Sequence, residues 1–362
     1  MKLPSVAILA LLLLFMLSCS HEPFVPETKA DVSLENEVHF KSNFQAKSKR
    51  LKATKVTEKV KLLYRNSHTS LVFDKKIWVF GGKHNGAITN DILYSENGVD
   101  WKAVSSKNVF TKRFGHASAV FNNRMWIVGG KNEQNALNDV WSSADGIHWV
   151  LENSDAQFPP RWELAMAQYK GELWISGGST QLPYQSEAVC CGFNDLWKSA
   201  DGINWVKLFD ISFGPNMFIG HQKTAFKEQL LVVGGNAFGD AGSVNYSTNG
   251  NPWTSAQNTV GFLHHSLEVS PNEILWAAAG IVNTNGMLGT TPSNDIWYSS
   301  NAINWTKANL TAAFPSRKHH SSVIFNNRLW IIGGVDGFNN DLGDVWSFSH
   351  HDFETQIDDV TS

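Results

Sequence analysis

Cysteine is scarce in this 362-residue chain, which contains three: Cys19, Cys190 and Cys191. A structural zinc site takes four ligands, so an adjacent pair is too small for one. Cys190 and Cys191 could form a vicinal disulfide or remain two partly buried thiols, and the residues leave both possibilities open. No metal and no other cofactor are expected.

Charge of one sign and long apolar runs are also lacking. The net charge is −3, so nothing in the charge indicates attraction to nucleic acid. The N-terminal apolar run extends from Val6 to Leu17. A transmembrane helix needs about 20 apolar residues, so this shorter run fits the core of a signal peptide.

The end of that run resembles the lipobox of bacterial lipoproteins. It reads Met16-Leu17-Ser18-Cys19, and the resemblance implies that Cys19 becomes the lipidated first residue. Leu17 stands where a smaller residue is usual, so ordinary secretory cleavage nearby is the alternative. We therefore expect a signal peptide over 1–18, a tether over 19–49 and an exported outer-membrane lipoprotein. The lipid would hold it to the membrane, facing the periplasm or the exterior.

Tryptophan is abundant, with 15 residues, and its positions follow a repeat. Strand-like runs end in paired glycines at 81–82, 129–130, 177–178, 234–235 and 333–334, with Ala279-Gly280 as a variant copy. An Asn-Asp pair follows in four copies, at 90–91, 138–139, 194–195 and 294–295. A period near 50 residues with paired glycines indicates a propeller rather than a helical solenoid.

These motifs resemble the kelch repeat in six copies. The resemblance implies an all-β fold, a six-bladed propeller of four-stranded blades, over residues 50–353, with an acidic tail over 354–362. Either residues from Phe353 onward or the segment Arg50–Ala53 could supply the last strand of the ring, and the second is favoured. Fourteen tryptophans recur at fixed repeat positions and are expected to pack between blades. Trp162 fits none of those positions.

The long connections between second and third strands, and those between blades, should emerge on one face, which is the candidate binding face. Arginines precede the first strand in four copies: Arg65, Arg113, Arg161 and Arg317. We expect them to surround the channel mouth with Trp162, His116 and His320 and to bind carboxylate or phosphate. The alternative is that these residues pair within the repeat. Each double histidine, at 264–265 and 319–320, can turn at most one ring inward.

The residues favour a binding module that holds a protein or an anionic glycan, and they favour binding over enzymatic activity. Kelch enzymes of the galactose oxidase type need a copper site for which the chain lacks the tyrosine–cysteine parts. A carbohydrate-active enzyme of the sialic acid mutarotase type is a second possibility, with Glu163 as the catalytic residue beside Arg161 and Trp162. A structural scaffold in an envelope complex is the third.

Overall fold

The structure is a computed structural model that describes residues 49–57, 63–106, 109–180, 192–210, 220–235, 243–257, 260–283 and 291–350. Every regular element in these ranges is a β-strand, which confirms the all-β prediction. None of the described segments forms a helix long and apolar enough to cross a membrane. The predicted signal peptide, Cys19, Cys190, Cys191 and the acidic tail lie outside the described residues.

Six antiparallel sheets of four or five strands make up the described fold, and we number them as blades in chain order. Blade 1 contains β3 (Thr69–Phe73), β4 (Lys76–Phe80), β7 (Ile92–Ser95) and β8 (Lys102–Ala103). Blade 2 contains β9 (Ala117–Phe121), β10 (Arg124–Lys131), β11 (Ala136–Ser143) and β12 (Val150–Asn153). Blade 3 contains β13 (Ala165–Tyr169), β14 (Glu172–Ser176), β15 (Asp195–Ser199) and β16 (Val206–Asp210).

Blades 4 to 6 follow the same order from the innermost strand outward. Blade 4 contains β17 (Gln222–Phe226), β18 (Gln229–Val233), β19 (Ser243–Ser247) and β20 (Thr254–Gln257). Blade 5 contains β22 (Ser266–Val269), β23 (Leu275–Ala278), β25 (Ile296–Ser299) and β26 (Thr306–Lys307). Blade 6 contains β28 (Ser321–Phe325), β29 (Arg328–Ile332), β30 (Val345–Ser349) and, from the other end of the chain, β1 (Arg50–Thr57).

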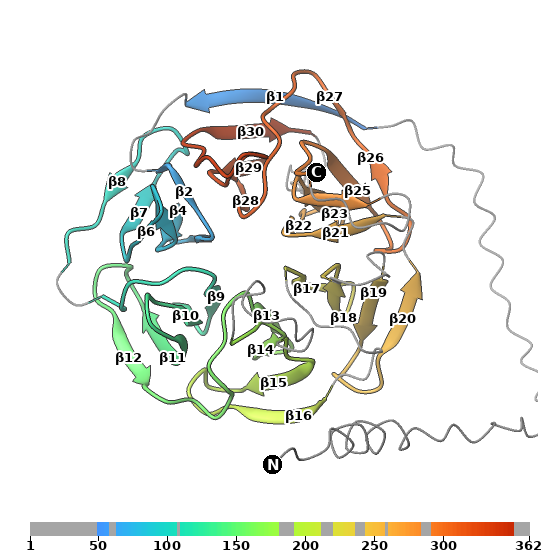
Figure 1. The fold of residues 1–362 in the computed structure, drawn as a ribbon. Coiled ribbons are helices and arrows are strands. Elements are labelled where there is room, and N and C mark those ends of the chain that lie inside the picture. Colours follow the sequence, from blue (N-terminus) through green and yellow to red (C-terminus); the bar gives the residue numbers. More distant parts are fainter. Residues whose placement is uncertain are drawn as a thin grey trace, which may run out of the picture. The chain divides into compact units, whose positions relative to one another are not determined.

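The innermost strands contact one another in a closed cycle, β3, β9, β13, β17, β22, β28 and back to β3. Figure 1 shows the blades arranged around this centre. The sheet of blade 6 is completed by β1, which pairs antiparallel with β30, so that Ala53 lies opposite Phe348. The N-terminal segment therefore supplies the outer strand of blade 6, as favoured from the sequence, and joins the two ends of the domain.

Short strands mark the face on which the long connections emerge. β2 (Arg65–Asn66) pairs with β5 (Lys83–His84), which pairs with β6 (Ala87–Ile88), and β21 (Gly261–Leu263) pairs with β24 (Ile281–Asn283). β27 (Asn309–Leu310) adds to β1 in parallel. Because the interblade connections of blades 1, 2, 3, 5 and 6 pair with the start of a long connection, the two kinds of loop share one face, as predicted.

The opposite face carries tight turns between the first two strands of each blade. In five blades both central residues of the turn have positive φ, as at Asp74 (47°) and Lys75 (56°) or Asn122 (48°) and Asn123 (55°), whereas the longer turn of blade 5 has positive φ at Glu273 alone. Positive φ at both positions defines the two-residue turn that matches the twist of paired strands. The rigid turns lie on this face, and the variable loops lie on the other.

The hydrophobic core lies between blades rather than at the centre. Six clusters of buried side chains each join two neighbouring blades. The second strand of a blade is buried on both faces, so its sequence is a continuous apolar run such as Ile77-Trp78-Val79-Phe80. The outer strand β12 is instead partly exposed, and its sequence is not a continuous apolar run.

A tryptophan and a glycine form a recurring contact across four of the interfaces between blades. The indole of Trp78 in blade 1 covers Gly146 of blade 2, where an added Cβ would lie 2.3 Å from ring atoms. The same contact joins Trp126 to Gly202, Trp174 to Gly250 and Trp330 to Gly98. Between blades 4 and 5 the smaller Leu231 replaces tryptophan, and Ala302 replaces glycine in the same cluster. Removing the indole leaves room for a methyl group.

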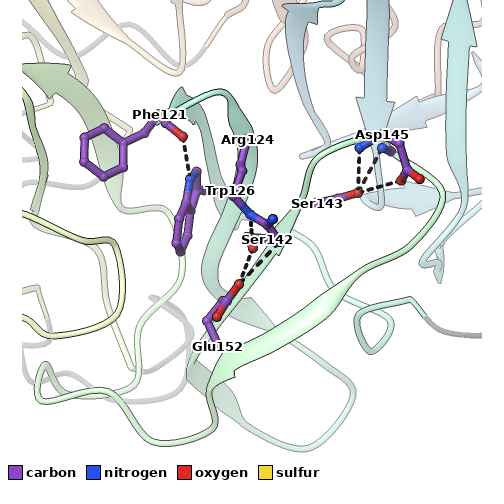
Figure 2. Close-up of polar contacts among 8 residues, drawn as sticks. Phe121, Arg124, Trp126, Ser142, Ser143, Asp145 and Glu152 are labelled. Carbon is purple, nitrogen blue, oxygen red and sulfur yellow. Dashed lines mark hydrogen bonds and ion pairs between the residues drawn. The ribbon is translucent and has the colours of Figure 1, made fainter.

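Most of the recurring indole N–H groups donate a hydrogen bond within their own blade. Trp126 Nε1 donates to the carbonyl of Phe121 at 2.9 Å (Figure 2). Figure 2 also shows Ser142 donating to Glu152 and the Ser143–Asp145 pair that fixes the next turn. Trp149 Nε1 donates to the Gly146 carbonyl. Packing between blades, rather than sugar stacking, is thus the role of these tryptophans.

The interface predicts a large difference between two glycines of similar conformation. Gly146 (φ 76°) lies under Trp78, whereas Gly171 (φ 74°) has nothing within 4 Å of an added Cβ. Gly146→Ala should therefore lower the free energy of unfolding by about 1–3 kcal/mol more than Gly171→Ala, because only the first overpacks a core. Urea unfolding measures both, and equal losses would contradict the interface described.

Candidate functional site

The four arginines are buried in the repeat rather than at the channel mouth. Arg113 donates to both carboxylate oxygens of Asp139 at 2.7 Å and to the carbonyl of Gly129 at 2.9 Å. Arg161 does the same with Asp195 and Gly177, and Arg317 with Asp344 and Gly333. Each guanidinium group thus links the segment before the first strand to a carbonyl of the paired glycines and to the aspartate at the third strand of the same blade.

Arg65 makes a looser version of this node. It donates to the Gly81 carbonyl, and its nearest carboxylate contact is to Asp91 at 3.5 Å. In blade 5 the corresponding residue is Phe262, and Asp295 pairs instead with Lys307 at 2.6 Å. The node thus varies between blades while the strand arrangement does not.

The electrostatics of the node in blade 3 favour the ionised form of Asp195. Burial by itself would raise the pKa of Asp195, but the Arg161 guanidinium and the Trp197 N–H bind the carboxylate and hold its pKa below the ordinary value. A buried bidentate pair of this kind is strongly destabilised when one partner is removed.

This placement corrects the expectation that the arginines face an external anion. Arg113, Arg161 and Arg317 are 0% exposed and Arg65 is 1% exposed. Their donors are occupied by the protein's own carboxylates and carbonyls. The alternative interpretation from the sequence, pairing within the repeat, describes them.

The histidines that begin the first strands join neighbouring blades. His116 is bonded to Thr69 Oγ1 of blade 1 at 2.9 Å, and His320 to Ser266 Oγ of blade 5 at 3.0 Å. His68 and His221 make similar bonds to Ser321 and Ser176. Burial lowers the pKa of His116 to about 3, and the charge of Arg113 adds to the effect. These imidazoles are therefore neutral parts of the scaffold.

Trp162 also has a place in the repeat, contrary to the sequence analysis. It follows Arg161 as Phe114 follows Arg113, and the two form equivalent bridges, to Ser179 and Lys131. The Trp162 ring is 7% exposed and packs edge-on against Phe114 at 5.4 Å. It does not present a stacking platform, so Arg161, Trp162 and Glu163 do not assemble as a sugar site.

The channel mouth is formed by the residue two positions before the start of each first strand. These six residues all have positive φ between 51° and 67°: Ser67, Gly115, Glu163, Gly220, His264 and His319. Four backbone hydrogen bonds link neighbouring members of this ring of residues: Ser67 N–H donates to His319 C=O, Gly115 N–H to Ser67 C=O, Glu163 N–H to Gly115 C=O and His264 N–H to Gly220 C=O. Left-handed backbone suits glycine, and a larger residue there stores strain of about 1–3 kcal/mol.

A cavity of about 210 Å³ opens at this ring. It is lined by all six positions and by hydroxyl groups of the first strands, including Thr69, Ser118 and Ser322. Typical small-molecule sites measure about 300–1,000 Å³, so this cavity suits one polar group of a ligand rather than a whole one.

Three polar side chains converge in the cavity. Ligand atoms of Glu163, His264 and His319 all lie within 4.8 Å of one another. His319 Nδ1 is 3.9 Å from a Glu163 carboxylate oxygen, and the rings of His264 and His319 are 4.2 Å apart between centroids. Burial raises the pKa of Glu163 to about 7, partly opposed by Lys83 and Lys318. Burial lowers the pKa of His264 to about 4 and that of His319 well below 6.5.

Cationic groups at the mouth come from lysines that the sequence analysis did not select. Lys318 directly precedes His319, and Lys83 Nζ lies 3.9 Å from the centroid of the Phe114 ring. Burial lowers the pKa of Lys83, while Glu163 and Asp341 raise it. The available positive charge therefore belongs to ammonium groups, not guanidinium groups.

Glu268 lies deeper along the channel on β22. Its carboxyl group accepts a hydrogen bond from Ser322 Oγ at 2.8 Å. Burial raises its pKa to about 8, and the Ser322 bond opposes the rise. The channel thus holds two carboxyl groups whose ionisation is suppressed.

The sequence analysis selected Glu163 but not His264 or His319, and the repeat itself could have pointed to all three. Gly115 and Gly220 show that the position two residues before the first strand suits glycine. Glu163, His264 and His319 depart from it, so the informative signal was the replacement of glycine rather than the recurring arginine. Cys190 and Cys191 lie outside the described residues, and their state stays a prediction.

Comparison with known proteins agrees with this architecture. A family model described as the KLHDC2/KLHL20/DRC7 Kelch-repeats domain matches residues 27–235, and the Kelch motif matches residues 316–352. The chain belongs to the kelch-repeat family. This confirms the family predicted from the sequence, and no curated protein matches the chain.

Solved structures support the fold of this kelch protein. It is similar to the structure titled "Structure of YjhT", with a TM-score of 0.59 and 16% identity, covering 78% of this chain and 93% of that chain. A likeness at that identity shows the fold alone. In all, 564 solved chains match, and a fold shared so widely does not specify a function. A propeller with a polar cavity supports a binding module in general terms.

The buried carboxyl of Glu268 predicts a pH dependence of stability. Its folded pKa lies above its unfolded value, so the unfolded state releases the proton first and stability falls as pH rises from about 4.5 to about 8. Glu268→Gln keeps an acceptor for Ser322 without ionising. Its melting temperature should fall less across this range than that of the wild type or of exposed Glu133→Gln. Parallel curves for all three proteins would contradict the suppressed ionisation.

Proposed function

We propose that this kelch protein is an exported, lipid-anchored binding module of the cell envelope that holds carboxylate-bearing glycans. The acidic group of the glycan is seated in the channel mouth, and the remaining sugars lie across the long-loop face. The anchor and the location depend on the sequence of residues 1–19, in particular Cys19.

The observation that carries the proposal is the small, hydroxyl-lined cavity, with Lys83 and Lys318 near enough for their charges to act on Glu163 in its wall. Ammonium groups attract a carboxylate, and serine and threonine hydroxyls can hydrogen-bond either to it or to neighbouring sugar hydroxyls. The cavity volume fits a carboxylate and its immediate surroundings. Phe338, which is 88% exposed, lies on a long connection of this face and offers an apolar contact for the rest of a ligand.

The mutarotase alternative loses two of its three proposed groups. Arg161 is occupied by Asp195, and Trp162 is buried against Phe114. Glu163 alone remains at the mouth, without a platform for the sugar ring beside it. A binding role therefore accounts for more of the described residues than this enzyme activity does.

A glycan array with sialylated, uronic and neutral sugars tests the proposal, using Cys19→Ser protein so that it is secreted without lipid. We expect binding to acidic glycans that weakens with salt. Lys83→Gln/Lys318→Gln should weaken it about 10-fold or more, since tenfold corresponds to about 1.4 kcal/mol. Lys75→Gln, in a tight turn of the opposite face, is the control. Absence of acidic-glycan binding, or equal binding by the double variant, would contradict the proposal, and binding of acidic peptides instead would indicate a protein ligand.

A further inference from the structure

The cluster of Glu163, His264 and His319 has the composition of a metal site, although the double histidines by themselves had argued against one. Strand alternation holds: His265 and His320 are buried between blades, whereas His264 and His319 turn into the channel. The third group, Glu163, comes from blade 3, opposite blade 6 in the ring. Sequence separation concealed it, since it lies about 100 residues or more before the histidines.

We propose that Glu163, His264 and His319 bind one divalent transition-metal ion at the channel mouth. Two imidazoles and one carboxylate on three elements form a ligand set used for zinc and for non-haem iron. Their ligand atoms already lie within 4.8 Å of one another. Small side-chain rotations would bring all three to one ion, whose ligands lie about 2.0–2.2 Å away.

The three groups lack other partners that would explain their position. In the described part of the chain, the side chains of Glu163, His264 and His319 make no hydrogen bond, and the nearest approach is the 3.9 Å contact between Glu163 and His319. Their side chains are largely withdrawn from water, with exposures of 13% for Glu163 and 23% for His319. Three polar side chains that face one another at the cavity, with no competing side-chain or backbone partner in the described residues, are available to coordinate a common ion.

Backbone strain is the second, independent observation. Glu163 (φ 56°), His264 (φ 51°) and His319 (φ 53°) occupy positions where two other blades have glycine. Strained non-glycine residues persist where a function requires the side chain. Gly220 supports His264 directly, because an added Cβ at Gly220 would lie 2.6 Å from His264 Nδ1.

The nearby lysines define what else the ion would bind. One carboxylate leaves a divalent ion with net positive charge, and Lys83 and Lys318 add to it. An anionic group in the cavity would neutralise this charge and fill the open coordination positions. In this respect the inference deepens the proposed function and rests on it, because the metal would contribute to holding the glycan carboxylate.

The experiment titrates Zn²⁺ into tag-free, chelator-treated Cys19→Ser protein by calorimetry, without any glycan. We expect one ion per chain and a higher melting temperature with Zn²⁺. His264→Gly and His319→Gly remove a ligand and restore the residue that the backbone favours, so the fold should survive. Each should weaken Zn²⁺ binding at least 10-fold and abolish the thermal shift, as should Glu163→Gln.

The control is His148→Ala, which removes an exposed histidine paired with Asp145 far from the mouth. It should bind Zn²⁺ like the wild type. No saturable binding in the wild type, or unchanged binding in the folded glycine variants, would overturn the metal site. Because the titration contains no glycan, failure of glycan binding with intact Zn²⁺ binding would count against the proposed function alone, and the reverse against the metal alone.

Discussion

The buried arginine–aspartate pair is the interaction on which each well-formed blade depends. Arg113 joins Asp139, the Gly129 carbonyl and its own Thr111 in one network. The paired glycines are required there because both have positive φ, and because an added Cβ would lie 2.9 Å from the Arg161 carbonyl oxygen at Gly129 and 2.8 Å from His116 Cβ at Gly130. Three motifs spread over more than 25 residues are therefore one physical unit, and their joint recurrence follows from it.

The same unit explains why the arginines are poor candidates for ligand binding. A guanidinium group that is bound bidentately and fully buried can release its partner only by leaving an uncompensated carboxylate inside the protein. The candidate site is instead formed at positions whose side chains the repeat does not use for packing. The residue two positions before each first strand needs only a left-handed backbone, so its side chain can vary toward Glu163, His264 and His319.

Much of the fold was predictable from the sequence because repetition reveals packing. Fourteen tryptophans recur at fixed positions, and the structure shows, for Trp78 and Gly146 for example, that they fill interfaces between blades. Ring closure by β1 was also predictable, since Arg50–Ala53 stands before a first strand as residues 100–103 do. The site was not, because its members come from blades 3, 5 and 6, and only the closed ring brings them together.

The sequence analysis assigned a function to residues that recur between blades, whereas residues that depart from the repeat were the better guide to the candidate site. Trp162 looked unique until the bridge to Ser179 placed it beside Phe114 in the same repeat position. Glu163, its neighbour, was selected for the right location but with partners, Arg161 and Trp162, that turn away from the channel. Adjacent side chains here face different surroundings, because the backbone is left-handed at Glu163.

Recurring residues build the scaffold, whereas the side chains of the mouth residues do not contribute to its stability. The most direct test compares the free energy of unfolding of Arg113→Ala with that of Glu163→Gly. The account predicts a loss of about 3–5 kcal/mol for the arginine variant. It predicts no loss for Glu163→Gly, which removes a buried carboxyl and a strained backbone. A stable Arg113→Ala protein, or an equal loss in both variants, would contradict the claim.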